Sequence, residues 1–147
     1  QWRLTSDYTY TGSGILDSNL EQVDGTGQGT LGSAMTESSG VFTFPSTGIY
    51  LVRFNATASL SGDRRSHYVQ IQSTTDNSSY GTRAEAISHI KQAESGTTYI
   101  QAVTETLLDV TDTSNHKVKF SVFTSALTRG NTSNNVTFMT FIRLGDT

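Results

Sequence analysis

Residues 42–60 read FTFPSTGIYLVRFNATASL and decide the fold of this chain. Within this stretch, apolar side chains recur at every second position of residues 50–60, with polar residues between most of them. Since successive side chains of a strand point to opposite faces, this alternation predicts a long β-strand with one face in a core. Residues 45–48, Pro-Ser-Thr-Gly, predict a turn before it, because proline fixes φ and glycine tolerates a positive φ. A short strand with Phe42 and Phe44 on one face therefore enters a tight corner.

Other parts of the chain repeat this pattern of short alternating or apolar runs separated by Gly, Ser, Thr and Asn, which predicts an all-β protein. The expected strands lie at residues 2–4, 15–23, 42–44, 50–60, 68–72, 80–90, 99–110, 118–122 and 136–144. About eight to ten strands at this spacing are typical of a two-sheet antiparallel sandwich. A chain of 147 residues can bury a stable core without disulfides, so residues 1–147 are predicted to form a single domain.

Spacing around the corner also carries a family resemblance. An aromatic residue, five further residues and then Gly-x-Tyr-x-Val-x-aromatic resembles the signature of C1q- and tumour-necrosis-factor-like (TNF-like) jelly rolls. The residues concerned are Phe42, Gly48, Tyr50, Val52 and Phe54, with Val52 where the family usually has an aromatic. Residues 137–141, TFMTF, resemble the closing strand of the same family, with Thr140 where glycine is usual. The resemblance implies a jelly-roll fold and assembly as a homotrimer through the sheet that contains the closing strand.

The last expected strand is apolar on both of its faces. One face carries Val136, Phe138, Ile142 and Leu144, and the other carries Met139 and Phe141. The strand around Val103 and Leu107 is similar. No helices are expected that could cover a second apolar face, and exposed apolar patches usually mark association sites. We therefore predict that Val103, Met139 and Phe141 lie at a trimer interface. The alternative is that one of the two faces is a covered strand end within a monomer.

Loops supply the candidate ligand contacts, because recognition modules carry specificity on loops held by a rigid scaffold. The densest charge cluster is Asp63-Arg64-Arg65, at a predicted turn. Adjacent arginines can hold a carboxylate or a phosphate with paired hydrogen bonds, although a solvated turn has the same composition. The candidate contacts are Asp63, Arg64, Arg65, Tyr80 and Arg129, and the candidate loops span residues 61–65, 74–80 and 128–135.

Several functional classes are excluded by what the sequence lacks. It has no cysteine, and its histidines at positions 67, 89 and 116 stand in no catalytic or metal-binding motif. We therefore expect no enzyme, no cofactor and no metal site, and no calcium loop of the Asp-x-Asp-x-Asp-Gly type occurs. A net charge of −3 with ten scattered Lys and Arg residues predicts no nucleic-acid binding. No run approaches the roughly 18 apolar residues that membrane insertion needs.

The amino-acid sequences of two segments indicate which kind of protein this domain belongs to. Residues 2–7 (WRLTSD) and 38–52 (SSGVFTFPSTGIYLV) are similar to C1q-like domains in structural proteins of tailed and marine phages. This resemblance implies a trimeric, non-enzymatic head of a viral fibre or virion structural protein, which lies on the virion surface and binds a host-surface glycan or protein receptor. The chain begins at Gln1, and we expect it to be the C-terminal head of a longer protein. The alternatives are a secreted, extracellular C1q/TNF-like ligand or lectin-like module of a cellular organism, and a purely structural capsid or fibre tip.

Overall fold

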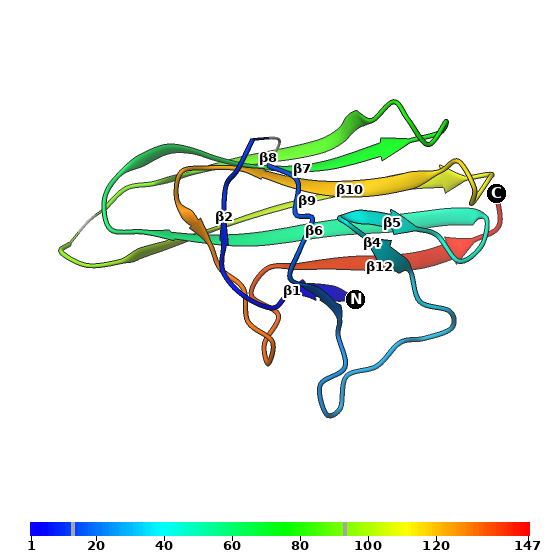
Figure 1. The fold of residues 1–147 in the computed structure, drawn as a ribbon, viewed down its shortest axis with the longest axis horizontal. Helices are drawn as coiled ribbons and strands as arrows, with labels where there is room; N and C mark the ends of the chain where they lie inside the picture. The colour runs from blue at the N-terminus through cyan, green and yellow to red at the C-terminus, as the bar shows by residue number, and fades with distance from the viewer. Residues whose placement is uncertain (13, 93) are drawn as a thin grey trace.

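The computed structural model describes residues 1–12, 14–92 and 94–147, which form strands, turns and loops. Two antiparallel sheets pack face to face, and their long strands run along the horizontal axis of Figure 1. The predicted all-β, two-sheet antiparallel sandwich is therefore confirmed. In the described part of the chain, no helix is long and apolar enough to cross a membrane.

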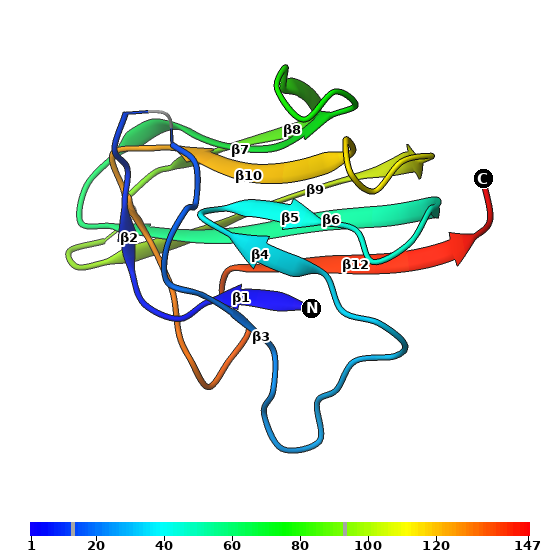
Figure 2. The ribbon, with the colours of Figure 1, turned by 45° about the vertical axis from the view of Figure 1, so that its right-hand side comes forward.

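The first sheet is built around the longest strands. Its strands are β1 (Trp2–Leu4), β2 (Tyr8–Thr9), β3 (Leu20–Gln22), β6 (Gly48–Leu60), β9 (Thr98–Val110), β11 (Leu127–Thr128) and β12 (Phe138–Gly145). Their order is β2-β11-β6-β12-β1-β3, and β9 pairs with β6 along its whole length. Figure 2 shows β6 and β12 side by side, with the segment between β3 and β4 extending away from the sandwich.

The second sheet covers the inner side of the first. Its strands are β4 (Thr36–Ser38), β5 (Val41–Thr43), β7 (Arg64–Thr74), β8 (Gly81–Ile90) and β10 (Lys117–Phe123), in the order β4-β5-β10-β7-β8. The described residues thus contain twelve strands, more than the eight to ten expected, because six of them have only two or three residues. The expected strand at 15–23 is reduced to β3 and an isolated bridge from Ile15, since a positive φ of 56° at Asn19 interrupts extended backbone.

Strand β6 follows the predicted alternation and leaves the predicted corner. Its inward side chains from Tyr50 to Ala56 are at most 3% exposed. The Tyr50 hydroxyl donates a hydrogen bond of 2.9 Å to the carbonyl of Ser46, which closes the corner. Gly48 has φ 142°, and a Cβ there would lie 2.5 Å from the carbonyl oxygen of Gly145. Only glycine therefore lets the end of β12 approach this point.

An aromatic cluster fills the space between the sheets. Phe42 of β5 lies 5.4 Å, between ring centroids, from Phe120 of β10, and Phe54 of β6 lies 5.1 Å from the same ring. Trp2 packs edge-on against Phe42 at 5.5 Å. Because these rings come from both sheets, the cluster holds the two layers together.

Cross-strand register decides which face of β12 lies inside. Met139 pairs opposite Phe54, and Phe141 opposite Val52. Directly opposite residues share a face of the sheet, and both β6 residues lie in the core. Met139 is accordingly 0% exposed, and Phe141 packs against the core. The prediction that Met139 lies at an interface is wrong, because this side chain is enclosed by its own sandwich. Phe141 is partly buried against the core, and its place at an interface stays a prediction. The outward side chains of β12 are those of Phe138, Thr140, Ile142 and Leu144.

Candidate functional site

The side of β6, β9 and β12 that points away from the second sheet is called the outer face. Residues that pair directly across β9, β6 and β12 form a row on this face. One such row is apolar, because Leu51 of β6 pairs with Leu107 of β9 and with Ile142 of β12. Leu107 is 60% exposed and Ile142 is 47% exposed. Three neighbouring strands thus present apolar side chains to solvent at the same level of the sheet.

Two further rows continue the outer face along β6. In the first, Arg53 and Glu105 form an ion pair with 3.7 Å between Nε and Oε2, and both side chains are more than half exposed. In the second, Asn55 lies between Phe138 and Val103. Val103 is 39% exposed on this face, which is the orientation that the sequence predicts for it. The outer face is therefore apolar with one charged row.

Asn55 is unusual among the outward side chains of β6. Only 6% of the residue is exposed, and its Oδ1 atom has no hydrogen-bond partner among the described residues. A buried acceptor without a partner costs about 1–3 kcal/mol, so such groups are rare in folded proteins. A donor from outside the chain could satisfy this atom.

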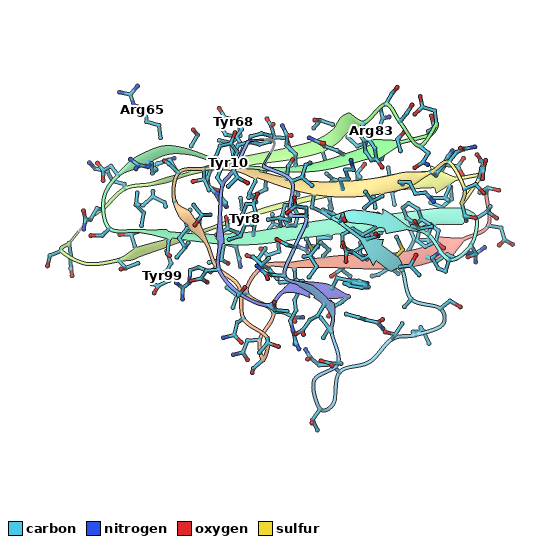
Figure 3. The ribbon with its side chains drawn as sticks, in the orientation of Figure 1. Tyr8, Tyr10, Arg65, Tyr68, Arg83 and Tyr99 are labelled. Carbon is cyan, nitrogen blue, oxygen red and sulfur yellow. The ribbon has the colours of Figure 1, made fainter. Side chains whose placement is uncertain are left out.

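A second surface lies where β6 runs into β7, and we call it the Arg65 groove. It has a volume of about 650 Å³ and is lined by Tyr10, Asp63, Arg64, Arg65, Ser66, Tyr68, Phe123, Thr124 and Ser125. Tyr10 lies over Phe123 with 5.8 Å between ring centroids, and Phe123 pairs with Tyr68 across β10 and β7. Figure 3 shows Tyr10 and Tyr68 along the same edge of the molecule, with Arg65 extending beyond the ribbon.

All three residues of the predicted charge cluster lie in this groove, but they have different roles. The Asp63 carboxylate accepts hydrogen bonds from Lys91 Nζ (2.6 Å) and from the Gln92 backbone N–H (2.7 Å), and these bonds lower the pKa of Asp63. Arg64 donates to the Asp63 carbonyl at 3.3 Å. Arg65 is exposed and has no hydrogen bond or ion pair within the described residues. Asp63 therefore ties the end of β8 to the turn, while the arginines remain available.

Tyr80 and Arg129 do not line the Arg65 groove. Lys119 Nζ lies 4.0 Å from the centroid of the Tyr80 ring, and burial together with the nearby Asp76 charge raises the pKa of Tyr80. Arg129 forms an ion pair with Asp7, with 2.7 Å between Nη1 and Oδ2. Both side chains thus have partners inside the chain.

The other two candidate loops are held by their own side chains. The Asp76 carboxylate accepts bonds from the Thr74 hydroxyl (2.6 Å) and the Ser79 N–H (2.7 Å), which keeps the pKa of Asp76 well below its usual range. Asn131 Oδ1 accepts from the N–H of Ser133 at 2.7 Å. Such bonds shape a loop from within, and they account for these polar residues without a ligand.

Sequence reasoning missed the aromatic part of the Arg65 groove. Tyr10, Tyr68 and Phe123 are far apart in the sequence, and only the pairing of β7 with β10 brings the last two together. A signal was present, since Phe123 extends the polar face of Lys117, Lys119 and Ser121 by one position. An aromatic residue on an otherwise polar face indicates a local contact or a binding surface.

No group of three or more His, Asp or Glu side chains within residues 1–12, 14–92 and 94–147 is arranged to hold a metal ion. His67 is fully buried, with its Nε2 3.3 Å from the Ala56 carbonyl oxygen, and desolvation lowers the pKa of His67. The two surfaces described above differ in chemistry, since the outer face is apolar with one charged row and the Arg65 groove is aromatic and cationic.

A scan against protein-family models and a search of curated protein sequences each return no match. Solved structures do match. Eiger TNF from S. frugiperda has a TM-score of 0.60 and 14% sequence identity, over 77% of this chain and 70% of that one. Murine APRIL, determined at pH 5.0, has a TM-score of 0.60 and 13% identity, over 78% of this chain and 80% of that one. At this identity the likeness establishes the fold alone, and the chain has a TNF-like jelly-roll fold.

Proposed function

We propose that this chain is a non-enzymatic, homotrimeric binding head of a viral fibre or virion structural protein, which attaches to a host-surface glycan or protein receptor. The observation that carries the proposal is the outer face, where Ile142, Leu51 and Leu107 form an apolar row across three strands. Large exposed apolar residues gather there: Tyr99, Val103, Leu107, Ile142 and Leu144. Such a patch favours association with a copy of the same chain.

The polar groups of the outer face also fit an interface between copies. Arg53 and Glu105 neutralise one another within the chain, so two such faces can meet without an unpaired charge. The Asn55 Oδ1 atom would accept a hydrogen bond from a neighbouring subunit. A three-fold arrangement is the one that the C1q/TNF-like resemblance implies, and the shared fold supports it.

The virion role rests on the similarity of residues 2–7 and 38–52 to phage structural proteins. A specific observation favours a second candidate, since one of the structural neighbours is a TNF. In that case the chain is a secreted, extracellular ligand of a cellular organism. Both candidates place the domain outside the cell, as a trimer that binds a surface partner.

Two measurements test the proposal. Light scattering should give a solution mass near three times 15.9 kDa, and a monomer at micromolar concentration would overturn the trimeric head. An antibody against the domain, imaged with gold particles, should label purified virions from an infected culture. Labelling confined to soluble protein of uninfected cells would instead support the secreted ligand.

A further inference from the structure

The start of β7 contains a β-bulge that changes where its side chains point. Arg65 and Ser66 together oppose His89 of β8, because the pairing shifts between Arg64 and His67. His67 is buried, and regular alternation would turn Arg65 to the same inner side. The bulge instead leaves Arg65 exposed, and bulges that re-aim a side chain are frequent beside functional sites.

The two arginines of the Arg65 groove form no ion pair with a carboxylate of the described residues. Its one carboxylate, on Asp63, is paired with Lys91. The guanidinium of Arg65 has no partner in the described residues, and that of Arg64 contacts only the Asp63 carbonyl there. A guanidinium presents a planar set of donors that matches a carboxylate, so the groove suits an anionic ligand.

The remaining lining is aromatic and hydroxyl-bearing. Tyr10 is 36% exposed, and its ring is held in position because its hydroxyl donates a 2.6 Å bond to the Gly12 carbonyl. Tyr68 and Phe123 continue the aromatic surface. Ser66 and Ser125 also line the groove, and their hydroxyls form no hydrogen bond among the described residues. Aromatic rings beside a few free polar groups are typical of small-ligand sites, which occupy about 300–1,000 Å³.

A peptide is a poorer fit than a sugar at this position. An extended peptide commonly binds by adding a strand to a free sheet edge. At Tyr68, β7 is already paired on both sides, with Phe123 of β10 and with Ile87 of β8. Beside Tyr68 the groove therefore offers rings, hydroxyls and guanidiniums, and among the described residues the edge of β7 that faces β10 is unpaired only over residues 64–67.

We propose that the Arg65 groove binds an acidic saccharide, with Arg64 and Arg65 pairing with a sugar carboxylate and Tyr10 and Tyr68 packing against the sugar ring. This inference rests on the proposed function and names the ligand class of that binding head. It uses side chains of one chain only, so the groove is complete in a single copy.

Calorimetric titration with two pairs of defined sugars tests the assignment. The first pair is oligogalacturonate and its fully methyl-esterified form, and the second is sialyllactose and its carboxyl methyl ester; the members of each pair differ only in the charge of the carboxyl groups. At least one acidic sugar should bind with a Kd about ten-fold or more below that of its neutral partner, because charged hydrogen bonds are the strong ones. Arg65→Gln should raise this Kd about ten-fold, and Tyr10→Ala should raise it several-fold.

Arg83→Gln is the matched control, because it also removes one guanidinium charge. Arg83 lies on β8 toward the other end of the molecule, where its Nε donates a hydrogen bond of 2.9 Å to Ser73 Oγ (Figure 3). This substitution should leave the Kd within two-fold. Binding of neither acidic sugar, equal binding of acidic and neutral partners, an unchanged Kd in Arg65→Gln, or tighter binding of a poly-glutamate peptide would each overturn the assignment. Light scattering on the same samples separates this failure from failure of the trimer.

Discussion

Replacing Leu107 with aspartate should separate the proposed trimer into folded monomers. Leu107 is 60% exposed in the single chain and stands in the apolar row of the outer face. Fully burying a leucine side chain stabilises by about 1.5–3 kcal/mol. Covering the exposed part therefore contributes ~1–2 kcal/mol per subunit and ~3–5 kcal/mol per trimer. A factor of ten corresponds to about 1.4 kcal/mol, so assembly should weaken at least ~100-fold, and burying a carboxylate adds to the loss.

The assay is light scattering over a dilution series, with circular dichroism to confirm the fold. Ile87→Asp is the control, because Ile87 is 56% exposed on β8 of the other sheet. We expect Leu107→Asp to fall from three times 15.9 kDa toward 15.9 kDa while Ile87→Asp keeps the larger mass. If both variants keep the wild-type mass at every dilution, the outer face is not the interface.

Three further predictions concern the stability of the domain. Desolvation lowers the pKa of buried His67, so the unfolded state takes up the proton of this imidazole at a higher pH than the folded state does. The contribution of neutral His67 to the free energy of unfolding is complete above about pH 6.5 and is lost as the pH falls, at up to ~1.4 kcal/mol per pH unit. Urea titrations at several pH values should therefore show a flatter pH dependence in His67→Gln than in the wild type. Gly48→Ala should destabilise by about 1–3 kcal/mol in thermal unfolding, because its φ is 142° and the Cβ meets backbone; a neutral effect would contradict the close approach of β12. Phe42→Ala should cost about 3–5 kcal/mol in the same assay, since the ring is 0% exposed and contacts Trp2, whereas a loss below 1 kcal/mol would mean that the cluster does not hold the sheets together.

Much of the fold follows from local pattern. The alternation of residues 50–60 predicts β6, and the Pro-Ser-Thr-Gly turn predicts the corner that Tyr50 closes onto Ser46. These features depend on residues close together in the chain, whose side chains alternate because of backbone geometry alone. The charge cluster at Asp63, Arg64 and Arg65 was visible for the same reason.

The candidate site depends on contacts that no local pattern contains. The sequence of the last strand shows that both of its faces are apolar. This pattern does not decide which of the two faces packs into the core. Pairing of Met139 with Phe54, 85 positions earlier in the printed sequence, turns Met139 inward and leaves Ile142 outside.

In the Arg65 groove too, some features follow from the sequence and others only from the tertiary structure. The sequence by itself determined a β-sandwich, its corner and a cluster of arginines at a turn. Only the tertiary structure decided that a bulge exposes Arg65, that Asp63 is engaged by Lys91, and that Tyr10 lies beside Phe123. The physical reason is that side-chain period is a property of one strand, whereas register and neighbours arise from pairing between strands distant in the chain.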